Sequence, residues 1–330
     1  MKKVVAVFAL AIVCACSDGD LQIENIDFDG GTVTFCPLLF EQEDIERTLF
    51  FKIVEDEALI LDLQSGLIEN LTPEDTITSD LGSQSKLTYR LFTETISNDY
   101  FCSEIPPLTP GVLEETTASD GIVNIVTMVD TVTNSVKTYI HDISISDLTI
   151  TNGSNERITD EPGLDFGTYS TTLDSSVEQE FENYPGESIV ICENESTSAK
   201  LVQLLNDEAI DFEFPLSFLV NQATDDPRTF SLGSVVNDTT ATFSNKVFKR
   251  IVDEDLICSE TPDTSDLENE FRTVSGTLSI ATTEDDDSTP ENGIFNHTLT
   301  LSNFVLEDSN GNASSEIETY VFGMVTTTTN

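Results

Sequence analysis

The stretch Asp99-Tyr100-Phe101-Cys102-Ser103-Glu104-Ile105-Pro106 occurs twice in this chain of 330 residues. Its second copy is Asp255-Leu256-Ile257-Cys258-Ser259-Glu260-Thr261-Pro262, 156 positions later. The same offset separates three further pairs: Cys36 and Cys192, the only two histidines, His141 and His297, and the dipeptides Phe166-Gly167 and Phe322-Gly323. A constant offset over so much of the chain indicates an internal duplication.

Alternation of apolar and polar residues predicts strands in both copies. In the second copy, apolar Ile210, Phe212 and Phe214 alternate with acids, which favours a strand over a helix. The segments predicted as strands are 21–28, 33–35, 49–54, 58–63, 86–92, 122–129 and 139–150 in the first copy, and 200–205, 209–214, 241–249, 277–281 and 295–306 in the second. Asp120-Gly121 and Ser275-Gly276 are typical of turns, and we expect loops over 105–115 and 261–269.

This pattern predicts an all-β protein of two tandem, duplicated β-sandwich domains, with small β-barrels as the alternative. We place the first domain at 21–172 and the second at 173–330, with a linker over 168–180 that is rich in Ser, Thr and acids. Each unit is then large enough to bury a core of its own.

The first residues have the pattern of an export signal. Lys2-Lys3 precede a short apolar run over 4–14, and Ala15-Cys16 follows. This end of the run resembles the lipobox of bacterial lipoproteins, which implies a signal peptide over 1–15 and a lipid on Cys16. An ordinary secretory signal is the alternative. A lipid on Cys16 would anchor the chain in a membrane, which is therefore an expected partner.

Ser17-Asp18-Gly19-Asp20 completes an acidic tether, 16–20, after the lipidated cysteine. Such a start resembles the surface-export signal of Bacteroidota lipoproteins. The resemblance implies an outer-membrane lipoprotein that is exposed at the cell surface. A plain acidic tether is the alternative, because the whole chain is acidic.

The charge balance excludes one class of partner. The chain has 61 acidic and 14 basic residues, a formal net charge of −47. This field repels nucleic acid and anionic lipid head groups, so we expect no nucleic-acid partner. A hydrophobic content of 38% with 20 phenylalanines indicates a folded protein and not a disordered acidic tail.

Four cysteines remain when Cys14 leaves with the signal peptide and Cys16 carries the lipid: Cys36, Cys102, Cys192 and Cys258. They allow three pairings. The duplication selects Cys36–Cys102 and Cys192–Cys258, because each pair spans 66 positions within one copy. Disulfides persist in exported proteins, and the absence of a C-x-x-C spacing disfavours a metal site at these cysteines.

Three sequence features together resemble a group of uncharacterised, flavobacterial-type Bacteroidota lipoproteins. They are the acidic start Cys16-Ser17-Asp18-Gly19-Asp20, the segment Asn98-Asp99-Tyr100-Phe101-Cys102-Ser103-Glu104-Ile105-Pro106-Pro107, and the later His141-Asp142-Ile143-Ser144-Ile145. The resemblance covers most of 16–150 and, more weakly, the second copy. It supports the envelope location and the paired cysteines, and it implies no activity.

No catalytic motif stands out. The two matched histidines lie far from any nucleophile motif, so we expect a structural role for both, and no G-x-S-x-G, H-E-x-x-H, P-loop or Rossmann fingerprint occurs. A close pair of carboxylates could hydrolyse glycosides, but 61 acids make such pairs unavoidable. The chain has no Trp, which weakens the case for sugar binding by aromatic stacking.

Two acidic loops are candidates for calcium, the only cofactor that the sequence suggests. Carboxylate and amide oxygens, which calcium prefers, occur at Asp285, Asp287, Asp308, Asn310 and Asn312. The EF-hand pattern is incomplete, since Ala313 and Thr319 take the places of its Gly and its final acid. Solvated acidic turns are therefore the preferred interpretation, with no bound cofactor.

We therefore expect a lipid-anchored envelope protein that acts as a non-enzymatic binding or structural module, with an extracellular or periplasmic ligand that the sequence does not identify. The alternative is a carbohydrate-binding accessory protein or a carboxylate-based hydrolase. A concave pocket that gathers acids with Tyr100 or Tyr169 would favour the alternative.

Overall fold

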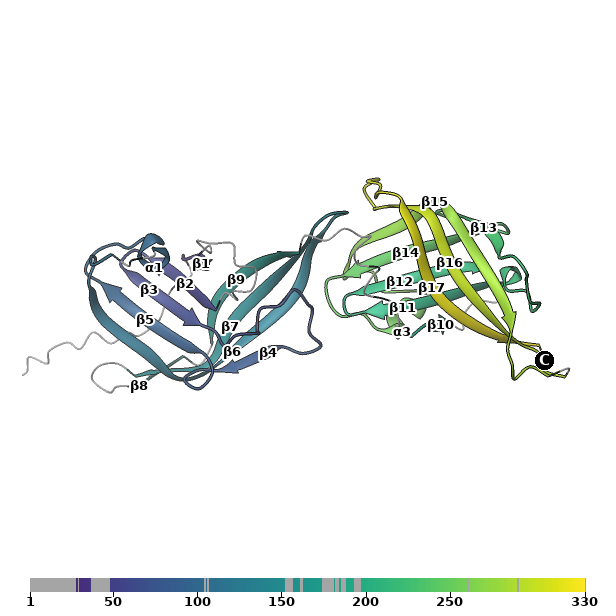
Figure 1. Ribbon diagram of the computed structural model, residues 1–330. Coiled ribbons are helices and arrows are strands. Elements are labelled where there is room, and N and C mark those ends of the chain that lie inside the picture. Colours follow the sequence, from purple (N-terminus) through teal and green to yellow (C-terminus); the bar gives the residue numbers. More distant parts are fainter. Residues whose placement is uncertain are drawn as a thin grey trace, which may run out of the picture.

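The computed structural model is an all-β protein with two tandem repeats, which confirms the fold class expected from the duplication (Figure 1). The structure describes residues 28, 30–36, 48–103, 105, 107–151, 157–160, 163–173, 181, 184, 188–192, 197–259, 261–289 and 291–329. The elements of the first repeat are β1 Thr34–Phe35, β2 Leu49–Val54, β3 Glu57–Asp62, β4 Ile77–Asp80, β5 Lys86–Phe92, α1 Asp99–Cys102, β6 Val112–Val132, β7 Lys137–Thr151, β8 Arg157–Asp160 and β9 Leu164–Leu173. Those of the second repeat are β10 Val190–Cys192, β11 Ser198–Leu205, β12 Glu208–Pro215, η2 Leu216–Phe218, β13 Arg228–Leu232, β14 Thr240–Phe248, α3 Glu254–Cys258, β15 Leu267–Glu284, β16 Ile294–Glu307 and β17 Ile317–Thr328.

Each repeat forms one sheet, with nine strands in the described part of the first repeat and eight in that of the second. The hairpins β2–β3 and β11–β12 correspond in register, since Leu49 pairs with Asp62 as Lys200 pairs with Glu213. In both hairpins the turn begins with a non-glycine residue at positive φ, Glu55 at 55° and Asn206 at 53°. The strand prediction is therefore confirmed for both hairpins.

The long strands β6 and β15 join the two layers of each repeat. The first half of β15 pairs with β14 and its second half with β13, while β16 pairs with β15 from Arg272 to Glu284. Figure 1 shows β15, β16 and β17 crossing the strands β10, β11, β12 and β14. The two layers thus belong to a single sheet that curls towards closure, as in the barrel alternative, and enclose a core like that of a sandwich.

The turns expected at Asp120-Gly121 and Ser275-Gly276 are wrong, because β6 and β15 continue through them. The register shifts at both places, and the glycines have φ of +145° (Gly121) and +139° (Gly276). A bulge with a glycine at positive φ bends a strand without ending it. At both glycines the chain changes direction within a strand and does not turn between two strands.

The Phe-Gly dipeptides have a related role in β9 and β17. Phe166 and Phe322 are buried in the cores of their repeats. Gly167 and Gly323 have φ of +110° and +143°, next to register shifts in the pairing with β7 and β16. Each dipeptide therefore fills the core with its first residue and bends the strand with its second.

A short helix covers one end of each sheet on the face away from the core. The helices α1 and α3 pack on the small apolar clusters that contain Phe51 and Phe92 in the first repeat and Val202 and Phe248 in the second. The disulfides Cys36–Cys102 and Cys192–Cys258 tie these helices to β1 and β10, as predicted. We expected no helix in the repeated motif, because a single turn is too short to show helical periodicity.

Three other expectations concern segment boundaries. The loops expected over 105–115 and 261–269 are shorter, because β6 begins at Val112 and β15 at Leu267. The linker expected over 168–180 is wrong in its first part, since β9 continues to Leu173. The signal peptide 1–15, the tether 16–20, Cys16, residues 21–27 of the first predicted strand and residues 174–180 of the linker lie outside the described residues.

The matched histidines are fully buried and join three strands in each repeat. His141 Nδ1 is hydrogen-bonded to Thr127 Oγ1 and Nε2 to Thr171 Oγ1, both at 2.8 Å. His297 has the same arrangement with Thr282 and Thr327, at 2.9 and 2.7 Å. Burial lowers the pKa of His141 to about 4 and also lowers that of His297. Both rings use both nitrogens to hold strands together, which supports the structural role expected from the sequence.

The tip of the β6–β7 hairpin in the first repeat enters the end of the second repeat. Val132 and Tyr139 belong to the second repeat's apolar core. Lys137 beside them forms ion pairs with Asp207, at 2.6 Å, and with Glu208, and all three side chains are buried. We call Val129, Val132, Lys137 and Tyr139 the inter-repeat plug. The second repeat thus completes its core with side chains from the first.

Candidate functional site

A polar concavity of about 440 Å³ lies on the outer face of the second repeat's sheet, beside the α3 end. Its floor is formed by neighbouring strands β11, β12, β14 and β15, and its rim by the segment after β13. The lining side chains are Lys200, Asp211, Glu213, Ser234, Val235, Val236, Thr242, Ser244, Lys246 and Arg272. Three of the chain's 14 basic residues gather here, against two carboxylates in the lining. Basic side chains are therefore concentrated in this concavity, on a strongly acidic protein.

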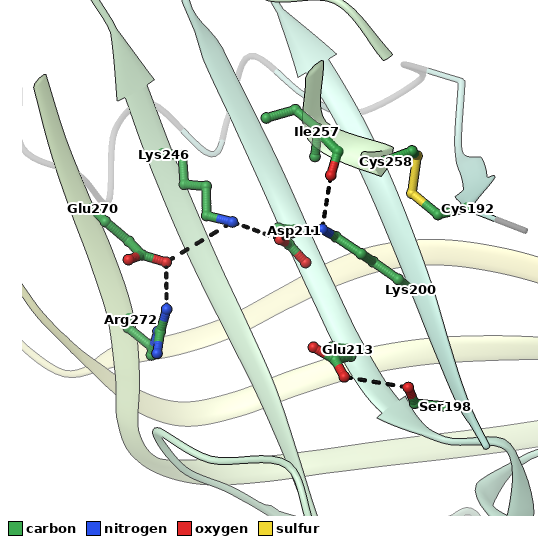
Figure 2. Close-up of polar contacts among 10 residues, drawn as sticks. All are labelled: Cys192, Ser198, Lys200, Asp211, Glu213, Lys246, Ile257, Cys258, Glu270 and Arg272. Carbon is green, nitrogen blue, oxygen red and sulfur yellow. Dashed lines mark hydrogen bonds and ion pairs between the residues drawn. A yellow bond between two sulfur atoms is a disulfide. The ribbon is translucent and has the colours of Figure 1, made fainter. Parts of the chain in front are cut away.

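Ion pairs fix the upper part of the concavity, as Figure 2 shows. Asp211 lies between two ammonium groups, with Lys246 Nζ at 2.7 Å and Lys200 Nζ at 3.3 Å from its Oδ2. Glu270 Oε1 forms ion pairs with Arg272 Nη2 at 2.7 Å and with Lys246 Nζ at 4.0 Å. Five side chains of alternating charge thus form a chain across neighbouring strands, in the order Lys200, Asp211, Lys246, Glu270 and Arg272. Their ion pairs hold each side chain in place.

The disulfide-tied helix also positions this site. Lys200 Nζ donates a hydrogen bond to the Ile257 carbonyl oxygen of α3 at 2.8 Å, and α3 ends at Cys258 in the disulfide (Figure 2). The C-terminal end of a helix presents carbonyl groups that favour a cation. The repeated cysteine motif thus acts on the concavity through the orientation of Lys200.

Other lining groups retain capacity for a ligand. Arg272 uses one guanidinium nitrogen for Glu270, and its side chain is 46% exposed. Glu213 accepts a hydrogen bond from Ser198 Oγ at 3.2 Å, which leaves further acceptor sites on the carboxylate. Thr242 Oγ1 is buried, and no hydrogen-bond partner for it occurs in the described part of the chain. The concavity can therefore offer a cationic fork, an acceptor and a hydroxyl to one small molecule.

The described part of the first repeat has no equivalent of this arrangement. The hairpin register places Leu49 where the second repeat has Lys200, and Ile60 where it has Asp211. Arg90, the counterpart of Lys246, forms a single exposed ion pair with Glu115 at 2.6 Å. The site is specific to the second repeat, although the scaffold beneath it is shared.

The residues proposed for calcium already serve their own loops. Asp308 Oδ1 accepts hydrogen bonds from the backbone amides of Asn310 and Asn312, at 2.9 and 2.8 Å. Asp285 accepts from the Asp287 backbone amide and from the Asn296 side chain. Among the described residues, no group of three or more His, Cys, Asp or Glu side chains is placed to hold a metal.

The two tyrosines considered for a ligand pocket lie elsewhere. Tyr169 is buried in the first repeat's core, and Tyr100 packs against Phe92 in the cluster under α1. The concavity itself was missed by sequence reasoning, because its lining comes from four strands and a loop. The only available signal was the replacement of apolar Leu49 and Ile60 by charged Lys200 and Asp211 between the two copies.

Comparisons with known proteins add nothing about this concavity, so its interpretation as a candidate site rests on the geometry alone. No protein-family model matches the chain, and no curated protein or solved structure shows significant similarity to it. In the portion of the chain that the structure describes, none of the helices combines the length and apolarity needed to span a bilayer.

Proposed function

We propose that this protein is a lipid-anchored component of the bacterial cell envelope that binds a small polar molecule, without chemical conversion, in the concavity of its second repeat. The observation that carries the proposal is the fixed cluster of basic side chains around Asp211 and Arg272 in a concavity of about 440 Å³. This volume is in the range of about 300–1,000 Å³ that is typical of ligand sites.

The donors and acceptors of the lining suggest the class of ligand. Arg272 fits an anionic group, since its planar guanidinium recognises carboxylates. Glu213 and Thr242 fit neighbouring hydroxyl groups. A sugar acid, which carries one carboxylate and several hydroxyls, provides both.

Titration calorimetry with D-glucuronate as the probe tests this proposal. We expect saturable binding by the full chain, and weaker or no binding of neutral D-glucose and zwitterionic glycine. Arg272→Gln should lower the affinity for glucuronate about tenfold, the effect of losing a charge-assisted hydrogen bond. The matched control is Arg90→Gln in the first repeat, which should leave the affinity unchanged.

Equal affinity of Arg272→Gln and the unchanged protein would contradict the proposal, and so would the absence of any heat with glucuronate. The paired substitution Cys192→Ala/Cys258→Ala provides a second test, because it releases α3 and with it the anchor of Lys200. It should weaken glucuronate binding, whereas Cys36→Ala/Cys102→Ala should not.

A hydrolase is the second candidate, and one observation favours it. Asp211 and Glu213 project from the same face of β12 into the concavity. Two carboxylates on one face can act as acid and base on a glycosidic bond. Two lysines already hold Asp211, however, which favours a structural role. Release of reducing ends from an acidic oligosaccharide, lost in Glu213→Gln, would establish the hydrolase.

The envelope location rests on the sequence of residues 1–20. Intact mass measurement of the protein from membranes should show an acylated Cys16 at the N-terminus. Protease treatment of intact cells should then remove the two repeats. Their survival until the outer membrane is opened would place them in the periplasm and contradict surface display.

A further inference from the structure

In the first repeat, the loop between α1 and β6 and the first two residues of β6 present apolar side chains to solvent. Ile105 is 83% exposed, Leu108 97% and Leu113 64%. The stretch from Ile105 to Leu113, Ile-Pro-Pro-Leu-Thr-Pro-Gly-Val-Leu, contains no charged residue, in a chain that is 23% charged. We call this stretch, 105–113, the apolar loop. Neighbouring exposed apolar residues on a folded protein indicate a contact surface.

The matching loop of the second repeat is polar. It runs from Thr261 to Asn269 with the sequence Thr-Pro-Asp-Thr-Ser-Asp-Leu-Glu-Asn, and Thr264 takes the place of Leu108. Its acids Asp263 and Asp266 are exposed. The shared architecture therefore does not require apolar residues at these positions, and their presence in the first repeat alone needs a separate reason.

The position of the apolar loop indicates what it contacts. It follows Cys102, whose disulfide to Cys36 fixes it beside the first strand of the repeat. Cys36 is 20 residues after Cys16, a distance of at most about 70 Å for an extended chain. Figure 1 shows α1 at the end of the first repeat that is remote from the second. The loop thus lies at the end that faces the proposed anchor.

We propose that the apolar loop inserts into the interface of the lipid bilayer that holds Cys16. This inference rests on the lipid anchor of the proposed function. Leu108 and its apolar neighbours would enter the boundary between head groups and acyl chains, while Glu114, directly after the loop, stays in water. The excess of acidic residues in the chain favours zwitterionic over anionic head groups. The loop would add a second contact and hold the first repeat against the membrane.

Tryptophan fluorescence tests this contact directly, because the chain has no tryptophan of its own. Leu108→Trp places a single reporter at the loop tip, and Thr264→Trp places one at the matched position of the second repeat. We expect the emission of acylated Leu108→Trp protein in phosphatidylcholine–phosphatidylethanolamine vesicles to shift to shorter wavelength. Brominated acyl chains should quench it. The Thr264→Trp protein should show neither effect.

Emission from Leu108→Trp that matches that from Thr264→Trp, on a protein with confirmed acylation of Cys16, would overturn the loop contact and leave the anchor intact. An intact mass without acyl chains would overturn the anchor and, with it, the argument for proximity to lipid. A wavelength shift that depends on protein concentration and not on vesicles would overturn the lipid contact in favour of self-association.

Discussion

The two repeats share a curled sheet, a disulfide-tied helix and a buried histidine, but they differ on their outer faces and at their ends. The second repeat has a charged concavity around Asp211, where the first has Ile60 and Leu49. The first has an apolar loop at Leu108, where the second has Thr264. The shared positions are those that shape the fold, and the differing ones lie on the outer face of the sheet and in the loop that follows the helix. The scaffold thus allows two faces with different chemistry on one chain.

The repeats also close their ends in different ways. In the first repeat, Tyr89 is buried beside β3 and packs edge-on against Phe28, with ring centroids 6.3 Å apart. The second repeat has the smaller Asn245 at the equivalent position and receives the inter-repeat plug. The first repeat therefore closes this end with its own side chain, whereas the second depends on its neighbour.

The largest effect should come from a methyl group at the bend of β15. A Cβ at Gly276 would lie 2.4 Å from Phe304 Cβ and 2.8 Å from Phe304 Cα, at φ of +139°. Gly276→Ala combines overpacking with backbone strain, and we expect a loss of about 4 kcal/mol in the free energy of unfolding. Urea denaturation measures this loss.

The matched variant Gly121→Ala sharpens the comparison of the repeats. Its Cβ would meet the terminal Leu81 Cδ1 at 2.9 Å, and a side-chain end moves more easily than backbone. Gly121→Ala should therefore cost less than Gly276→Ala. Equal losses would mean that backbone strain at positive φ dominates and that the close contact with Phe304 contributes little.

Removal of the charged side chain of the inter-repeat plug should lower the free energy of unfolding by a similar amount. Lys137→Met leaves Asp207 and Glu208 buried without their cation, and we expect a loss of about 3–5 kcal/mol. Burial already raises the pKa of Asp207, against the opposing effect of Lys137. Thermal unfolding should show the second repeat melting first. The control is Lys249→Met, which removes a half-exposed pair with Glu268 and should cost less than about 1 kcal/mol.

If Lys137→Met were as stable as the unchanged protein, the plug would not support the second repeat. The triple variant Lys137→Met/Asp207→Asn/Glu208→Gln separates charge from packing. It removes the unpaired carboxylates and should recover part of the lost stability, because the apolar contacts of Val132 and Tyr139 remain.

The smallest effect concerns pH and should have the same direction in the two repeats. Since burial lowers the pKa of folded His141 to about 4, the unfolded chain binds a proton first as the pH falls below about 6.5. Stability from this residue is complete above that value and is lost down to pH 4, by up to about 3 kcal/mol. His297 should act in the same direction.

Proton NMR titration of the two imidazoles measures this directly. Both folded pKa values should lie below 6.5, and the difference in stability between pH 7 and pH 5 should shrink in His141→Asn. An imidazole that titrates near 6.5 in the folded protein would show that its Thr–His–Thr bridge is open to water.

The sequence was most informative where the two copies could be compared. It predicted the disulfides, the hairpins and the structural histidines, because a fixed offset or a strict alternation marks each of them. It failed at Gly121 and Gly276, where a bulge and a turn share the same residue signal, and at α1 and α3, which are too short for periodicity. The concavity and the inter-repeat plug are built from residues of distant segments, and the pattern of residues within one segment does not indicate which distant residues it will contact.

The plug has a consequence for how the chain matures. Polypeptides emerge from the ribosome with the N-terminus first, so β6 and β7 appear before any strand of the second repeat. The surface that completes the later core is thus in place when that core begins to assemble. If the two halves were exchanged in the gene, the protein would contain the same residues, but β6 and β7 would be synthesised last. The apolar end of the repeat that they complete would then be exposed to solvent while its core assembles.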